Sequence, residues 1–177
     1  TVRLGSATVA AVGFGLLPAS VEYPDPARVP SAAQVEEMLA RLLAAGVDVL
    51  DVADTYCVDE TRYHSAERLV GEAVRRSGRT DVRVATKGGM RREGRGSTSW
   101  RPARDSSPRG VRAAVLASQR ALSAGSSGGD PPKALPPIFL WQLHHTDAYL
   151  KTPERFDAVL RELGALCDEG VLLHVGL

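Results

Sequence analysis

Short apolar segments alternate along the chain with longer segments of helical periodicity. The short segments are rich in β-branched residues, which is typical of buried strands. They lie at residues 47–52, 82–86, 138–143 and 171–177. In the longer segments apolar residues recur every three or four positions, as on one face of an amphipathic helix. The longer segments begin at Ser31, Ser65, Ser107 and Thr152. The pattern therefore predicts strands and helices in regular alternation.

Residues that start and stop helices lie at the expected helix ends. Ser31 and Gln34 have the spacing of a capping box, and Gly46 is placed to end the helix that they begin. Ser65 is expected to cap the second helix, which ends before Gly78. These signals give the first two helices defined boundaries.

The order of the elements limits the fold class. Val2–Leu4 and Thr8–Val12 flank Gly5-Ser6, which predicts an N-terminal β-hairpin that leads into the first strand of the sheet. A strand followed by four helix–strand pairs predicts a parallel sheet with right-handed crossovers. An open doubly wound sheet and a parallel (β/α) barrel of the TIM type both satisfy this order. A complete barrel needs about 250 residues, so residues 1–177 would form a single partial barrel domain, truncated after about five strands.

Two segments have no apolar periodicity and are predicted to be irregular loops. Residues 91–107 contain arginines, glycines and Trp100, and residues 123–137 are rich in Gly, Ser and Pro. The arginines could contact a phosphate or a nucleic acid. However, 22 basic residues face 21 acidic ones and only 5% of the residues are aromatic, so we expect no nucleic-acid partner.

Composition excludes several other classes of protein. With 44% hydrophobic and 24% charged residues, the chain has the composition of a globular protein. Its two cysteines, Cys57 and Cys167, are too few for a disulfide framework, which favours a reducing, cytoplasmic location. The long uncharged stretch Leu4–Val21 is interrupted by glycine and proline, so we predict neither a membrane span nor a signal peptide there.

Four reactive side chains lie at or just after the predicted strand ends. In parallel α/β folds these ends meet at one rim, where reactive residues gather. Three strands end at Asp51, Lys87 and His144, and Tyr56 follows the first of them. An ammonium group near a phenol favours the phenolate, and a carboxylate can hold the ammonium in place. Together with a neutral imidazole as hydrogen-bond donor, this set suits proton transfer to a carbonyl oxygen while a cofactor supplies hydride.

Each of these residues also has a purely structural interpretation. Asp51 could satisfy backbone donors in a turn, Tyr56 could be a half-buried aromatic residue, and Lys87 could extend from a strand end into water. His144 could be a core histidine. These alternatives predict no convergence on one rim, which favours the functional interpretation. No metal site is predicted, because His144 and His145 are neighbours on a strand and point to opposite faces.

Several segments resemble the aldo-keto reductase family. Residues 46–56, which end in Asp-Val-Ala-Asp-Thr-Tyr, are similar to the family's strand and loop Asp-Thr-Ala-x-x-Tyr-Gly. Residues 65–71 resemble its Ser-Glu-x-x-Leu-Gly helix, and Val84–Lys87 matches its Thr-Lys strand end. Residues 141–147 are similar to its Gln-Leu-His segment, and residues 170–177 resemble the stretch that runs on into Ser-Asn. The motifs occur in the family's order over nearly the whole chain.

The resemblance implies a barrel enzyme that reduces an aldehyde or ketone with NADPH. Tyr56 would be the proton donor, Lys87 its charged partner, Asp51 the anchor of Lys87, and His144 the residue that orients the substrate carbonyl.

Residues 13–16, Gly-Phe-Gly-Leu, are similar to the family's first loop beneath the nicotinamide. The resemblance therefore assigns Gly15, Leu16 and Asp51 to the cofactor site.

The sequence also departs from the family pattern. Val52 stands where threonine is usual, and Cys57 replaces the glycine that normally follows the tyrosine. After Leu177 the family continues with three more strand–helix units, which hold much of the cofactor's phosphates. A five-stranded sheet has two open edges, so a chain that ends at Leu177 is expected to associate with itself or with a partner. The alternative function is therefore a catalytically inactive partial barrel that serves as a binding or regulatory module.

Overall fold

The computed structural model describes residues 1–20, 30–57, 62–92, 100–103, 105–123, 136–144 and 152–177. In this part of the chain, five parallel strands form one sheet in the order β3-β4-β5-β8-β9. These strands are β3 (Phe14–Gly15), β4 (Val49–Asp51), β5 (Arg83–Gly88), β8 (Ile138–Leu143) and β9 (Leu172–Gly176).

The strand order distinguishes between the two predicted fold classes. In a doubly wound sheet the chain reverses direction across the sheet, so the strand order breaks at a switch point. Here each strand of the sheet pairs in parallel with the next one along the chain. Sequential winding of this kind is that of a (β/α) barrel, and it confirms the predicted partial barrel. Strands β3 and β9 are the two edges of the sheet.

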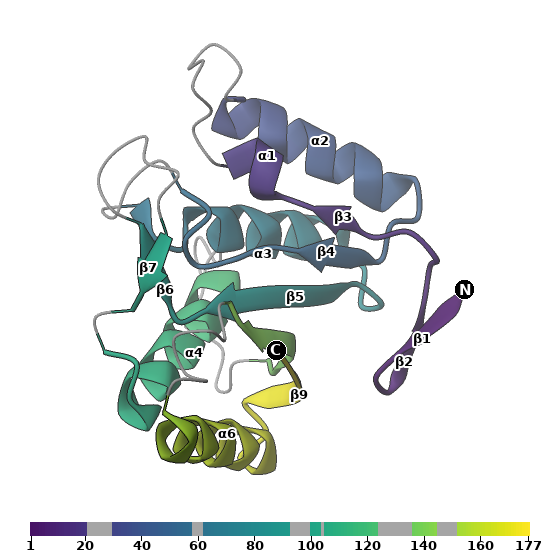
Figure 1. Cartoon of the computed structure of the whole chain (residues 1–177). Coiled ribbons are helices and arrows are strands. Elements are labelled where there is room, and N and C mark those ends of the chain that lie inside the picture. Colours follow the sequence, from purple (N-terminus) through teal and green to yellow (C-terminus); the bar gives the residue numbers. More distant parts are fainter. Residues whose placement is uncertain (21–29, 58–61, 93–99, 104, 124–135, 145–151) are drawn as a thin grey trace, which may run out of the picture.

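Four long helices cover one side of the sheet (Figure 1). They are α2 (Ala32–Ala44), α3 (Ser65–Ser77), α4 (Pro108–Ser123) and α6 (Pro153–Asp168). Each packs against the next in chain order. The short helix α1 (Leu17–Ser20) follows β3 and was not predicted.

The core consists of two apolar clusters between the sheet and these helices. One joins β4 to α2 and α3 and includes Leu50 and Val70. The other joins β8 and β9 to α4 and α6 and includes Trp141 and Leu163. Leu122 packs against both clusters, which makes the core continuous.

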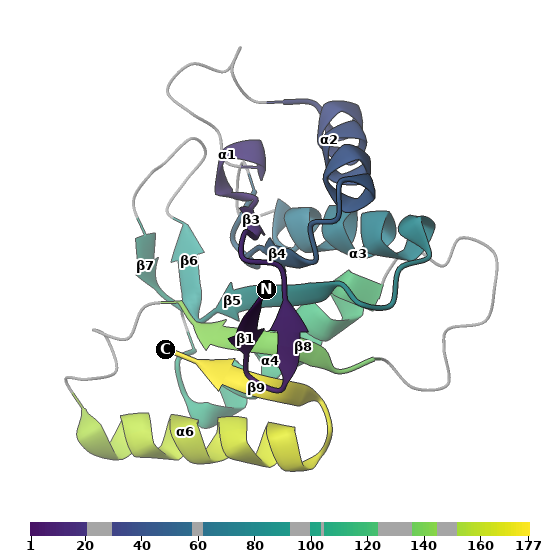
Figure 2. The same cartoon turned by 90° about the vertical axis from the view of Figure 1, so that its right-hand side faces the viewer.

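A β-hairpin lies at the end of the sheet where the strands begin (Figures 1 and 2). It consists of β1 (Val2–Leu4) and β2 (Ala7–Val9), which pair antiparallel as predicted. The Ser6 hydroxyl lies 2.9 Å from His174 Nε2 on β9. This contact ties the hairpin to the edge strand β9.

A second antiparallel pair corrects the prediction of an irregular loop over residues 91–107. Strands β6 (Met90–Arg92) and β7 (Trp100–Pro102) pair directly after β5. The amide of Ala103 donates to the carbonyl of Gly89, which continues the pairing. Residues 93–99 and 104 lie outside the described part of the chain, as do residues 124–135 of the second predicted loop.

The predicted helix caps are confirmed for α2 and wrong for α3. The Ser31 hydroxyl accepts from the Gln34 amide, and the Gln34 side chain accepts from the Ser31 amide, which completes the capping box. The N-cap of α3 is His64 rather than Ser65, with a left-handed backbone at φ 66° and no side-chain cap. His64 takes this place because its amide is bound to the Asp54 carbonyl at 2.7 Å.

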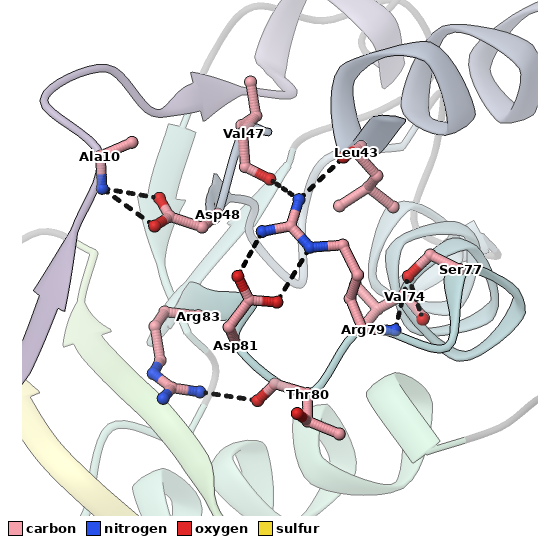
Figure 3. A network of polar contacts seen from close by, with 10 residues as sticks. All are labelled: Ala10, Leu43, Val47, Asp48, Val74, Ser77, Arg79, Thr80, Asp81 and Arg83. Atoms are coloured by element: carbon pink, nitrogen blue, oxygen red, sulfur yellow. Dashed lines mark hydrogen bonds and ion pairs between the residues drawn. The ribbon is translucent and has the colours of Figure 1, made fainter. Parts of the chain in front are cut away.

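Arg79 fastens α2 to the beginning of β4 (Figure 3). Its Nη1 donates to the carbonyl oxygens of Leu43 and Val47, at 2.8 and 2.9 Å. The Leu43 carbonyl belongs to the last turn of α2 and also accepts from the Gly46 amide at 3.1 Å. The guanidinium group also pairs with Asp81 through both carboxyl oxygens. These contacts hold the end of α2, the start of β4 and the start of β5 together.

Two helical glycines predict opposite effects of the same substitution. A Cβ on Gly71 in α3 would lie 2.0 Å from the Leu122 carbonyl oxygen in α4, whereas a Cβ on Gly164 in α6 would meet nothing within 4 Å. We expect Gly71→Ala to destabilise the fold by about 1–3 kcal/mol through overpacking. Gly164→Ala is expected to stabilise it by about 0.5–1 kcal/mol, because alanine has less backbone freedom to lose. Urea unfolding of both variants measures the two changes in the free energy of unfolding. If both variants were stabilised or both destabilised, the close approach of α3 and α4 would be contradicted.

Candidate active site

The loop after β4 is bound to β5 by main-chain hydrogen bonds. The amide of Val52 donates to the Ala85 carbonyl at 2.9 Å, and the amide of Asp54 donates to the Lys87 carbonyl at 3.0 Å. The amide of Tyr56 then donates to the Ala53 carbonyl in a tight turn. The loop is therefore an ordered continuation of the sheet, and it carries Tyr56 to the end of β5.

Lys87 lies at the centre of the site. Its Nζ donates to Asp51 Oδ2 at 2.6 Å, to the Val52 carbonyl oxygen at 3.1 Å and to the Tyr56 hydroxyl oxygen at 3.3 Å. An ammonium group has three N–H donors, so these three acceptors use its full capacity. The Lys87 side chain is 16% exposed and that of Asp51 39%. The ammonium is thus held next to the phenol by an ion pair that only partly faces water.

His144 completes the group of four predicted residues. Its ring packs edge-on against the Tyr56 ring, with the centroids 5.9 Å apart and the planes at 69°. Its amide donates to the Gly88 carbonyl at 2.9 Å, which fixes the end of β8 beside that of β5. Tyr56 itself is 6% exposed. The structure therefore brings together all four side chains that were predicted from the strand ends.

The residues assigned to the cofactor lie on the neighbouring strand. Gly15 pairs with Asp51 in the register of β3 and β4. A Cβ on Gly15 would meet only Asp51 Oδ2, at 3.9 Å, so the backbone leaves open space beside this carboxyl group. The side chain of Leu16 is fully buried in the core, and its amide donates to the Asp51 carbonyl. A cofactor contact at Leu16 would therefore use the main chain.

A buried polar cluster beside the four residues was not predicted. Glu67 and Thr86 are fully buried and Asp54 is 6% exposed. The Thr86 hydroxyl donates to Glu67 Oε1 at 2.6 Å, and Glu67 Oε2 lies 2.5 Å from His64 Nδ1. One signal for the cluster was present in the sequence: Glu67 lies in the apolar stripe of α3, three residues before Val70.

Burial controls the protonation of the acidic and basic groups in this cluster. Desolvation, with the nearby charge of Glu67, raises the pKa of Asp54 from 3.8 to about 8. Burial alone would lower the pKa of His64, but its hydrogen bond to Glu67 and the charges of Glu67 and Asp54 raise it overall. At neutral pH Asp54 is therefore mainly protonated.

The described residues offer neither a metal centre nor a membrane-spanning helix. None of their His, Cys, Asp and Glu side chains form a group of three or more that could hold a metal ion. Among the helices in this part of the chain, none is both long and apolar enough to cross a membrane.

Comparison with known proteins agrees with the sequential barrel. The sequence model described as "Aldo/keto reductase family" matches residues 12–177. No match is found among the curated proteins.

Several solved structures share the fold. The chain is similar to the aldo-keto reductase AKR11C1 from Bacillus halodurans (holo form), with 26% identity and a TM-score of 0.68 over 98% of this chain and 48% of that one. For the glycerol dehydrogenase AKR11B4 from Gluconobacter oxydans the identity is 25% and the TM-score 0.65, over 97% and 45% of the two chains. MGS-M4, an aldo-keto reductase enzyme from a Medee basin deep-sea metagenome library, has 17% identity and a TM-score of 0.61, over 96% and 46%.

The chain spans about half the length of these similar proteins. Its own length, in contrast, is matched almost completely by the family's sequence model. The chain belongs to the aldo/keto reductase family.

Proposed function

We propose that this protein is an NADPH-dependent oxidoreductase that reduces an aldehyde or ketone to an alcohol, with Tyr56 as the proton donor. The proposal rests mainly on one observation: the Lys87 ammonium contacts the Tyr56 hydroxyl at 3.3 Å and the Asp51 carboxyl at 2.6 Å at the same time. A lysine that only extends into water would not contact a carboxyl group and a phenol at the same time. The contact of Lys87 with both groups suits a phenol that donates a proton.

The chemistry follows from where charge develops. A bound nicotinamide cofactor supplies the hydride. As the carbonyl carbon gains a hydride, its oxygen gains negative charge and needs a proton, which the Tyr56 hydroxyl donates. The Lys87 ammonium stabilises the phenolate that remains. Asp51 keeps Lys87 in position through their ion pair.

His144 would orient the substrate. Its ring lies against the Tyr56 ring, so a neutral imidazole there can donate a hydrogen bond to the same carbonyl oxygen that receives the proton. Two donors that converge on one oxygen fix the carbonyl for attack.

The residues present fit part of the cofactor. Gly15 leaves open space beside the partly exposed carboxyl group of Asp51, which supports a role of both residues in holding the nicotinamide end. The name of one similar structure, glycerol dehydrogenase, supports a small molecule with an alcohol–carbonyl pair as the substrate. The chain's two cysteines, Cys57 and Cys167, are too few for a disulfide framework, which supports a reducing compartment such as the cytoplasm.

NADPH fluorescence and turnover test this proposal directly. We expect the fluorescence to change when the protein is added, and the absorbance of NADPH at 340 nm to fall when an aldehyde is present. The Glu72→Gln variant is the control, because the Glu72 carboxyl group pairs with Arg75 and Arg76 of α3 and not with the four site residues. Aldehyde-independent oxidation, or no oxidation with bound NADPH, would contradict the reductase.

A non-catalytic binding or regulatory module is the second candidate. The observation that favours it is that the chain covers about half the length of similar proteins. For such a module we expect no change in NADPH fluorescence, even when the protein is in large excess over the cofactor. A saturable change together with aldehyde-dependent oxidation of NADPH would exclude this candidate.

A further inference from the structure

Glu67 is a buried acidic residue that the proposed chemistry does not use. It lies in the first turn of α3 and has no exposed surface. Both of its carboxyl oxygens are engaged, one by the Thr86 hydroxyl at 2.6 Å and one by the His64 ring at 2.5 Å. An apolar side chain of similar volume would be less costly to bury. The two hydrogen bonds of Glu67 connect it to two other parts of the site.

One of them acts on the end of β5. Thr86 immediately precedes Lys87, and successive side chains of a strand point to opposite faces. Thr86 reaches α3, while Lys87 reaches Asp51 and Tyr56. The Thr86–Glu67 bond thus anchors one face of the strand end at the point where its other face carries the ammonium.

The other hydrogen bond acts on the loop that carries Tyr56. Glu67 contacts the His64 ring, and the His64 amide donates to the Asp54 carbonyl at 2.7 Å. The Asp54 amide in turn donates to the Lys87 carbonyl at 3.0 Å. The hydrogen bonds therefore form a closed circuit through the end of β5, the loop after β4 and the start of α3.

We propose that Glu67 is a positioning residue, which holds Lys87 at the Tyr56 hydroxyl by tying Thr86 to His64. The consequence for turnover rests on the proposed reductase function. The consequence for Lys87 does not, because the reactivity of its amine can be measured without any cofactor.

The key variant is Thr86→Val, which removes one hydroxyl group and preserves the volume. We expect acetic anhydride to acylate Lys87 about 2- to 10-fold faster in Thr86→Val, because losing one such hydrogen bond loosens the strand end by about 0.5–1.5 kcal/mol. Thr86→Ser retains the hydroxyl and should restore the slow rate. Mass spectrometry of the Lys87 peptide gives the rate, with the chain's other lysines, Lys133 and Lys151, as internal references.

Glu67→Gln tests the other half of the circuit. Without the negative charge, the pKa of His64 should fall toward or below its ordinary value of 6.5, which NMR titration of the imidazole proton measures. Lys87 should also be acylated faster than in the wild type. Glu72→Gln, in the same helix, should change neither value, because the Glu72 carboxyl group pairs with Arg75 and Arg76 and not with His64 or Thr86.

Measurements of turnover distinguish the positioning role of Glu67 from the proposed reductase function. If the wild type reduces an aldehyde, Thr86→Val should lower kcat about 10-fold with little change in the KM for the aldehyde, because the proton donor is displaced rather than the substrate. If the wild type is inactive, the reductase proposal fails, and acylation of Lys87 still decides the role of Glu67. If Lys87 is acylated at the wild-type rate in both Thr86→Val and Glu67→Gln, and circular dichroism shows that both variants are folded, the positioning role of Glu67 is overturned. If Glu67→Gln does not fold, Thr86→Val alone decides.

Discussion

Replacing Tyr56 with phenylalanine is expected to lower kcat/KM for aldehyde reduction by about 10²–10⁴-fold. The ring is 6% exposed and packs in the apolar cluster of β4, α2 and α3. Phenylalanine retains this packing and removes only the hydroxyl group. Lys87 would keep its bonds to Asp51 and to the Val52 carbonyl, so the site would lose its proton donor and little else. Steady-state kinetics, together with NADPH binding by fluorescence, measures the effect.

Tyr63→Phe is the matched control for this variant. Tyr63 precedes α3, and its carbonyl oxygen accepts from Arg68 Nη2, a main-chain contact that phenylalanine preserves. We expect wild-type activity and wild-type cofactor binding in Tyr63→Phe. Equal activities of the two variants would show that the proton comes from elsewhere. A loss of NADPH binding in Tyr56→Phe would instead assign Tyr56 to the cofactor site.

The main features of the fold and of the candidate site follow from local sequence patterns. Strand β8 was predicted with its observed bounds, Ile138–Leu143, because a short run with one polar residue, Gln142, directly follows Pro137. Parallel strands put their carboxyl ends at one rim, so the sequence alone groups Asp51, Lys87 and His144. The direction of each strand was enough for this prediction.

Other features depend on contacts between distant segments, which periodicity does not report. Strands β6 and β7 have little alternation, and Pro102 lies within β7, yet the two strands pair, and the Ala103 amide donates to the Gly89 carbonyl next to them. The N-cap of α3 is His64 and not the predicted Ser65, because the Asp54 carbonyl accepts a hydrogen bond from the His64 amide. In both cases a tertiary hydrogen bond outweighs the local preference.

The buried cluster is a further case of this kind. Asp54 follows a strand and Glu67 lies in a helix, and acidic residues are most often exposed at such places. The pairing of Glu67 with Thr86 joins residues 19 positions apart. A charged residue within an apolar stripe was the only local indication. Such a residue is best treated as a candidate for a buried hydrogen bond.

Asp54→Asn is expected to stabilise the protein at neutral pH and to flatten its pH profile. Burial raises the pKa of Asp54 to about 8 in the folded protein, against 3.8 for an ordinary aspartate. Between these values the folded state holds a proton that the unfolded state releases, so the free energy of unfolding falls as pH rises. The gap of about 3 pH units between 3.8 and pH 7, at 1.36 kcal/mol per unit, corresponds to about 4 kcal/mol. Asparagine is neutral and has the same shape, so the variant does not lose this free energy of unfolding as pH rises.

Urea unfolding between about pH 5 and pH 8 measures the difference between wild type and Asp54→Asn. The raised pKa of His64 gives both proteins some loss of stability as pH rises. The excess slope of the wild type therefore belongs to Asp54. Asp157→Asn, at an exposed position on α6, should leave the wild-type slope unchanged. Parallel profiles for wild type and Asp54→Asn would mean that the Asp54 carboxyl is already ionised in the folded protein.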